Sequence, residues 1–121
     1  MRRASLRKSF EFAAAHALTG VPEKHPCRVL HGHTWTVFVE VAGMIDPDTG
    51  MVLDYRKVSE VVKPLIDRLD HSNLNDFFSN PTSENVAHWL YAEIAKCLPK
   101  LYAVEVSESP KTLCRVTKDD L

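Results

Sequence analysis

Apolar and polar residues alternate along three stretches of the chain, a pattern typical of strands that bury one face. These stretches are residues 3–13, 31–43 and 101–108, and a turn after the third leads into a last strand near residues 112–117. The first stretch places Phe10 and Phe12 on one side, and the second places Trp35 and three valines on one side. We therefore expect two strands before and two strands after the central part of the chain.

The central part begins with the period of an amphipathic helix. This helix starts after Asp54, a typical N-cap residue, and ends near Asp70–His71. Its apolar residues recur at spacings of three and one, at Val58, Val61, Val62, Leu65, Ile66 and Leu69. Pro64 lies inside the pattern and should remove one backbone hydrogen bond and bend the helix. We expect residues 72–76 to form a loop.

A second helix is expected over residues 83–98. Thr82 or Ser83 supplies the N-cap, and Glu84 lies in the first turn, where the helix dipole favours an acid. Pro99 follows the end of the helix. The chain therefore has the element order ββααββ.

This order predicts an α+β fold in a single domain over residues 1–121. Consecutive strands without crossover helices favour a four-stranded antiparallel sheet, and both helices must then pack on one of its faces. Two sheet edges remain open and invite pairing with another chain, so a homo-oligomer is expected.

Composition excludes several classes of protein. The 121 residues are 45% hydrophobic, which is enough for a core, and the net charge of −1 gives no basic footprint for nucleic acid. No apolar run reaches the roughly 18 residues of a membrane span, and no signal-peptide core follows the first charges. Three cysteines without framework spacing do not indicate a disulfide-stabilised secreted domain, so we expect a cytoplasmic protein.

Two of the histidines lie at the start of the predicted strand over residues 31–43. His31 and His33 are two residues apart and leave the same face of an extended strand. His16, which follows the first predicted strand after three alanines, is the best candidate for a third ligand. Together the three would make a three-histidine site, for which zinc is the first expectation, although iron, copper and nickel also accept imidazole. His25 falls in the intervening loop, and His88 occupies a helix position that suits solvent.

Cys27 lies four residues before His31 and allows three interpretations. It is a fourth ligand that closes the site, a thiolate base near the metal, or an inert thiol. Cys97 and Cys114 lie within the apolar patterns and are expected to pack in the core.

Two acidic positions add candidate chemistry. In Asp70–His71 a carboxylate next to an imidazole can fix the tautomer of the ring, provided that the two side chains touch. Glu108 lies at the end of a strand, either solvated or facing inward, where it would need hydrogen-bond donors from a ligand.

Taken together, these residues resemble the 6-pyruvoyl-tetrahydropterin synthase / 6-carboxytetrahydropterin synthase family. The matching signals are Phe12-x₃-His16, Cys27-x₃-His31-Gly-His33, Leu69-Asp-His71-x₂-Leu74-Asn75, Pro81-Thr-Ser-Glu84-Asn85 and Glu108. They follow the family order and cover nearly the whole chain. The resemblance implies the T-fold, whose members join their sheets into barrels and form active sites at subunit interfaces.

The resemblance also implies a role for each matching residue. Catalytic zinc would be held by His16, His31 and His33. Cys27 would abstract a proton, Asp70 and His71 would form a second proton-transfer unit, and Glu108 would anchor the pterin through its 2-amino and N3 groups. Thr82, Ser83 and Glu84 match a stretch near the pterin, and the substrate implied is 7,8-dihydroneopterin triphosphate.

The spacing between the cysteine and the histidine pair divides the family. Three residues separate Cys27 from His31, as in the carboxy-forming members of the queuosine (7-deazaguanine) pathway, whereas animal-type pyruvoyl-forming members have five. This similarity implies a zinc-dependent lyase that makes 6-carboxy-5,6,7,8-tetrahydropterin with loss of triphosphate and acetaldehyde. The alternatives are a pyruvoyl-forming synthase and a non-catalytic zinc- or pterin-binding module.

Overall fold

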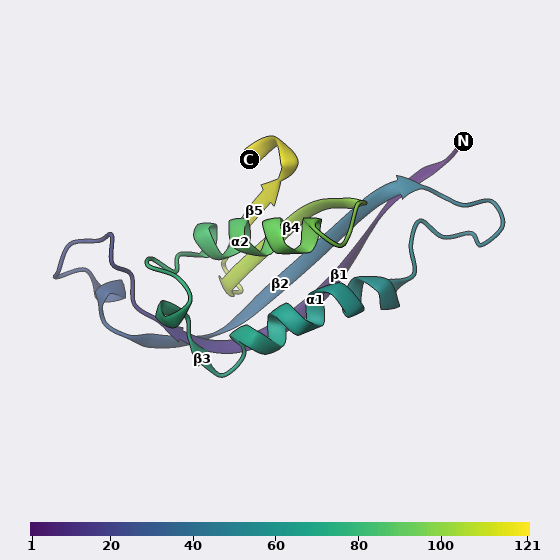
Figure 1. Cartoon of the computed structure of the whole chain (residues 1–121). Coiled ribbons are helices and arrows are strands. Elements are labelled where there is room, and N and C mark those ends of the chain that lie inside the picture. Colours follow the sequence, from purple (N-terminus) through teal and green to yellow (C-terminus); the bar gives the residue numbers. More distant parts are fainter.

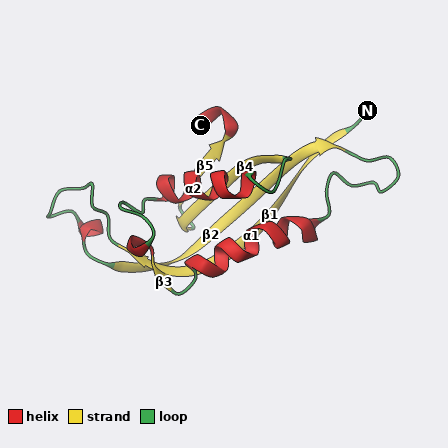
Figure 2. Ribbon diagram, in the orientation of Figure 1, coloured by secondary structure: helices red, strands yellow, loops and turns green.

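The computed structural model describes residues 1–121 as one sheet with two helices on one face (Figures 1 and 2). The elements in chain order are β1 (Arg3–His16), η1 (Pro26–Arg28), β2 (His31–Met44), α1 (Tyr55–Leu69), β3 (Ser72–Asn73), η2 (Leu74–Asp76), α2 (Ser83–Ala95), β4 (Leu101–Ser109), β5 (Thr112–Thr117) and η3 (Lys118–Asp120). The order of strands in the sheet is β3-β1-β2-β4-β5. The expected α+β fold with two helices and antiparallel main strands is confirmed.

The two longest strands, β1 and β2, pair antiparallel over 14 residues each. Their register aligns Phe12 with Trp35 and His16 with His31. The even positions of β1 and the odd positions of β2 face the helices, and the rings of Phe12 and Trp35 stack in the core with centroids 5.7 Å apart. The same register therefore packs the core and brings two distant histidines together.

Helix α1 begins as predicted, because the Asp54 side chain accepts a hydrogen bond from the backbone N–H of Arg56. The helix buries Val58, Val62, Ile66 and Leu69 against the sheet. It continues through Pro64, which lies on the exposed side, so the carbonyl that loses its partner faces water.

Helix α2 uses Thr82 as its N-cap, with the side chain accepting from the backbone N–H of Asn85. It ends at Ala95, three residues before the predicted end, although Leu98 is still buried in the following turn. The shorter helix leaves Cys97 exposed, so its predicted packing role is wrong, whereas Cys114 packs against the core as expected.

The sheet has five strands rather than the expected four. The additional strand, β3, is only two residues long and pairs parallel to β1 at Ala14 and Ala15. The predicted loop at residues 72–76 is therefore β3 followed by a 3₁₀ turn. No β-branched residue marks this segment, and it pairs only because the end of α1 delivers it to the open edge of β1.

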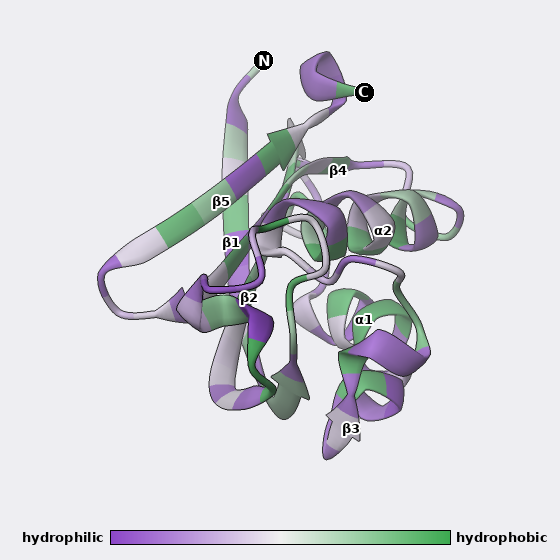
Figure 3. Ribbon diagram, turned by 90° about the vertical axis from the view of Figure 1, so that its left-hand side faces the viewer, coloured by the Kyte–Doolittle hydropathy of each residue, from purple (hydrophilic) through white to green (hydrophobic).

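The helices cover one face of the sheet and leave the other bare, as Figure 3 shows from the side. On the bare face, the carboxylate of Glu105 lies 3.3 Å from Arg7 and 3.4 Å from Arg115, and these side chains bury it. No helix of the chain is long and apolar enough to cross a membrane.

Candidate metal centre and active site

Three histidines meet at one end of the sheet, on the face that the helices cover. His16 ends β1, and the register places it opposite His31, the first residue of β2. His33 follows on the same face because side chains alternate along a strand. One ligand nitrogen from each ring lies within 4.8 Å of the others, and His16 is 1% exposed. The predicted three-histidine cluster is therefore confirmed.

Backbone carbonyls fix the orientation of two of these rings. Nδ1 of His16 lies 2.7 Å from the carbonyl oxygen of Pro81, and Nδ1 of His31 lies 2.7 Å from that of Val29. A carbonyl only accepts, so each Nδ1 donates and the lone pair stays on Nε2. Burial lowers the pKa of His16 below its usual value, so its ring is neutral near pH 7.

Two ring nitrogens of the cluster have no hydrogen-bond partner, and they indicate which kind of ligand the site binds. Nε2 of His16 and Nε2 of His33 are buried and have no hydrogen-bond partner. A buried polar atom without a partner is costly, and a divalent cation would satisfy both nitrogens. In a tetrahedral zinc site the ligand nitrogens are about 3.4 Å apart, and here they lie within 4.8 Å of one another. The residues fit a metal ion.

Glu108 reaches the cluster from β4. Its carboxylate lies 3.7 Å from Nε2 of His33, and its side chain is 28% exposed. Two residues of β4, Ser107 and Glu108, face one residue of β5, which is the pattern of a β-bulge. Of the two interpretations made from the sequence, the inward-facing one is therefore correct.

Cys27 lies in the 3₁₀ turn η1, close to the cluster in sequence but outside the group of ligand atoms. The side chain of His25 caps this turn by accepting from the backbone N–H of Cys27 at 3.1 Å. The carbonyl of Cys27 accepts from the N–H of Leu18 at 2.8 Å, two residues after His16. Because Sγ of Cys27 does not join the three histidine nitrogens, the geometry disfavours the interpretation of Cys27 as a closing ligand.

Asp70 and His71 do touch, with Nδ1 of His71 3.0 Å from the Asp70 carboxylate. The other Asp70 oxygen accepts from the N–H of Ala13, and that bond, followed by His71, holds the pKa of Asp70 below its usual range. The His71 side chain is 83% exposed, and its backbone has φ = 57°. The pair lies at the outer edge of β1 and makes no contact with the histidine cluster of its own chain.

Thr82, Ser83 and Glu84 lie at the start of α2. The hydroxyl of Thr82 is used as the helix cap, and the hydroxyl of Ser83 donates to Glu84. The preceding residue is Pro81, whose carbonyl orients His16, so the stretch adjoins the cluster. Sequence reasoning missed this carbonyl because backbone groups leave no signal in the residue pattern.

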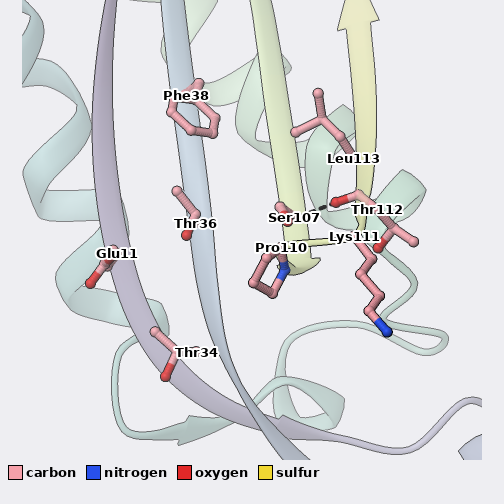
Figure 4. Close-up of a pocket in the computed structure, with 9 residues that line it drawn as sticks. All are labelled: Glu11, Thr34, Thr36, Phe38, Ser107, Pro110, Lys111, Thr112 and Leu113. Atoms are coloured by element: carbon pink, nitrogen blue, oxygen red, sulfur yellow. Dashed lines mark hydrogen bonds between the residues drawn. The ribbon is translucent and has the colours of Figure 1, made fainter.

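A hollow of about 560 Å³ lies on the bare face of the sheet (Figure 4). It is lined by Glu11, Thr34, Thr36, Phe38, Ser107, Pro110, Lys111, Thr112 and Leu113. Thr34 and Thr36 alternate with His33 and Trp35 along β2, so the sheet separates the hollow from the histidines. The hollow is therefore not part of the histidine site.

Comparison with known proteins gives consistent matches. The sequence profile of the 6-pyruvoyl tetrahydropterin synthase family matches residues 5–119. The chain is 38% identical over 116 residues to 6-carboxy-5,6,7,8-tetrahydropterin synthase of Synechocystis, covering 89% of this chain and 88% of that protein. It is 42% identical over 88 residues to dihydroneopterin monophosphate aldolase of Pyrococcus furiosus, covering 73% and 72%. The solved structure of 6-pyruvoyl tetrahydropterin synthase from Caenorhabditis elegans superposes with a TM-score of 0.89 at 28% identity, covering 97% of this chain and 96% of that one.

Proposed function

The chain belongs to the 6-pyruvoyl tetrahydropterin synthase family, and on that basis we propose that it converts 7,8-dihydroneopterin triphosphate to 6-carboxy-5,6,7,8-tetrahydropterin. One water is consumed, triphosphate and acetaldehyde are the other products, and the reaction belongs to queuosine biosynthesis in the cytoplasm. The observation that carries the proposal is the stretch Cys27-x₃-His31-Gly-His33, which joins an open three-histidine site to the cysteine spacing of carboxy-forming enzymes. The similarity to the Synechocystis synthase over 89% of the chain supports it. Residues 1–121 act in it as one domain.

The three histidines hold zinc in this proposal. Bound zinc supplies a Lewis acid that lowers the pKa of substrate hydroxyl groups and stabilises negative charge on their oxygens. The carbonyls of Pro81 and Val29 keep Nδ1 of His16 and His31 protonated, which directs Nε2 of each ring toward the ion. Three imidazole ligands carry no charge when they bind a metal, so they would leave the ion its full positive charge to act on an oxygen of the substrate.

Protons and pterin are handled by the surrounding residues. The thiolate of Cys27 removes a carbon-bound proton, and the Asp70–His71 pair returns one. Asp70 keeps the imidazole of His71 oriented through their 3.0 Å contact. Glu108 binds the pterin by accepting from its paired N–H groups, which the position beside His33 allows. Thr82, Ser83 and Glu84 complete the pterin pocket.

The site of one chain requires a second copy. The His71 side chain is 83% exposed, and the side chains of the pair contact only each other and the backbone N–H of Ala13 among hydrogen-bonding groups, so in this proposal they serve the histidine site of another protomer. Beside Cys27, Val29 and Leu30 are 68% and 55% exposed, an apolar pair that a neighbouring chain would cover. The open edges of the sheet offer the route for this assembly.

Relatives with other activities suggest alternative functions for this chain. The 42% identity to the Pyrococcus aldolase favours a second candidate function, cleavage of a dihydroneopterin side chain without formation of a carboxylate. A pyruvoyl-forming synthase is the third. A non-catalytic binding module is disfavoured because zinc or pterin binding alone needs neither Cys27 nor the Asp70–His71 pair.

The proposal is tested by incubating the zinc-loaded protein with 7,8-dihydroneopterin triphosphate and following acetaldehyde. We expect release that stops after chelation and resumes when zinc is restored. Substrate that the zinc-loaded protein leaves intact would contradict the proposal.

A further inference from the structure

We propose that Asn75 is a positioning residue that sets both His16 and the start of the loop that carries Cys27. Oδ1 of Asn75 accepts from the backbone N–H of Ala17 at 2.8 Å, and Nδ2 donates to the carbonyl of the same residue at 2.9 Å. Ala17 directly follows His16 in the chain. One amide side chain thus occupies both backbone groups next to a metal-ligand candidate. The inference rests on the function proposed above.

The side-chain amide of Asn75 forms the two backbone hydrogen bonds that a neighbouring strand would otherwise form at Ala17. β3 pairs with β1 at Ala14 and Ala15, and the chain then turns into η2, so its backbone leaves the edge of the sheet. An asparagine side chain offers one acceptor and two donors, which are the groups that a paired strand would present. The backbone N–H and carbonyl of Ala17 therefore have hydrogen-bond partners, although β3 pairs no further than Ala15.

A second contact holds the same edge on the other side of β3. The carboxylate of Asp70 accepts from Ala13 at 2.9 Å, and the N–H of His71 donates to the Ala13 carbonyl at 2.6 Å. The end of β1 is thus held at Ala13 and at Ala17, with His16 between the two. Residues 70–75 therefore have two roles. They carry the Asp70–His71 pair, and they hold the end of β1 where His16 lies.

Asn75 is itself well anchored. Its backbone N–H donates to the side chain of Asn73 at 3.0 Å, and the neighbouring Leu74 is completely buried in the core. From Ala17 the chain continues to Leu18, whose N–H donates to the carbonyl of Cys27 at 2.8 Å. Two hydrogen-bonded contacts, from Asn75 to Ala17 and from Leu18 to Cys27, therefore connect the buried Leu74 segment to the loop that holds the proposed base.

Removal of the amide should loosen the histidine and the cysteine together. In the Asn75→Ala variant the backbone of Ala17 has only water as a partner, so His16 loses one of the contacts that hold its position, while the Pro81 carbonyl and the pairing with β2 remain. We expect affinity for zinc to fall about tenfold or more, the range seen when groups that orient metal ligands are removed. kcat should fall with it, while KM changes little because Glu108 lies on β4.

The experiment measures zinc and Co²⁺ affinity of the metal-free protein by competition with a chromophoric chelator, and records the visible spectrum of the Co²⁺ form. Asn80→Ala is the matched control, because Asn80 also bonds the loop, accepting from Thr19 at 3.1 Å, but three residues beyond His16. Asn75→Asp keeps the acceptor for the Ala17 N–H and loses the donor, so it decides the question if the alanine variant does not fold. Far-UV circular dichroism confirms folding of each variant.

We expect both Asn75 variants to bind metal more weakly and with an altered Co²⁺ spectrum, and Asn80→Ala to stay within about threefold of wild type. Wild-type affinity in both Asn75 variants would overturn the inference and leave the proposed function standing. Equal weakening in Asn80→Ala would also overturn it, because general ordering of the loop would then explain the effect. Wild-type protein that binds neither metal would overturn the inference and the proposed function together.

Discussion

Zinc should stabilise the folded chain strongly, because the three histidines come together only in the folded state. Unfolding separates His16 from the His31–His33 pair, so an ion that needs all three binds the native protein alone. The perturbation is removal of zinc by a chelator, followed by its return at a free concentration about a hundredfold above the dissociation constant. Nε2 of His16 and of His33 then regain partners.

The size of the effect follows from linkage. At this concentration the free energy of unfolding rises by about 2.7 kcal/mol. A chain of 121 residues has an unfolding entropy of roughly 250 cal/mol/K near its midpoint, from about 2.1 cal/mol/K for each residue. The ratio of the two predicts an increase in Tm of about 10 °C.

The assay is thermal unfolding followed by circular dichroism at one fixed protein concentration, with and without zinc. His16→Ala should lose most of the increase, since two imidazoles remain. His88→Ala is the matched control, because His88 is exposed on α2 and far from the cluster in sequence. A full increase in the His16→Ala variant, or none in the wild type, would refute the assignment of the ligands.

The pH dependence has a definite sign. Burial lowers the pKa of His16 in the folded state, so the unfolded chain binds more protons as the pH falls below about 6.5. Stability of the metal-free protein should therefore decline as the pH drops through this value. The increase in Tm that zinc gives should shrink over the same range, because protons compete for the ligand nitrogens.

Three further outcomes are expected. Cys27→Ala should keep zinc and the fold while losing most turnover; loss of zinc, measured by metal analysis, would favour a ligand role instead. His71→Gly should be about 1 kcal/mol more stable in urea unfolding than His71→Ala, because glycine adopts φ = 57° without strain, and both variants should lose turnover. Sedimentation at micromolar concentration should show more than one chain, and an active monomer would contradict the shared site.

Much of the fold was predictable because its long elements carry clear periods. The alternation around Trp35 and the spacing of apolar residues after Asp54 each allow only one orientation of their element. The end of β1 was less visible, since three alanines carry no alternation, and pairing with β2 extends the strand to His16. β3 was not predictable, because two polar residues join the sheet only through the position of α1.

The site was predictable where its geometry is local. Parity alone placed His31 and His33 on one face, and the antiparallel register supplied His16. The contacts that position these residues span long distances in sequence, 58 residues from Asn75 to Ala17 and 57 from Asp70 to Ala13. No periodic pattern reports such pairs, so they emerge only from the folded chain.

The identity of the pterin product decides between the proposed reaction and its alternatives. Zinc-loaded protein and 7,8-dihydroneopterin triphosphate are incubated to completion, and the pterin is identified by mass spectrometry while acetaldehyde is measured in parallel. We expect 6-carboxy-5,6,7,8-tetrahydropterin and one acetaldehyde for each substrate consumed. Accumulation of 6-pyruvoyltetrahydropterin without acetaldehyde would contradict it, as would a cleaved pterin that lacks the carboxylate.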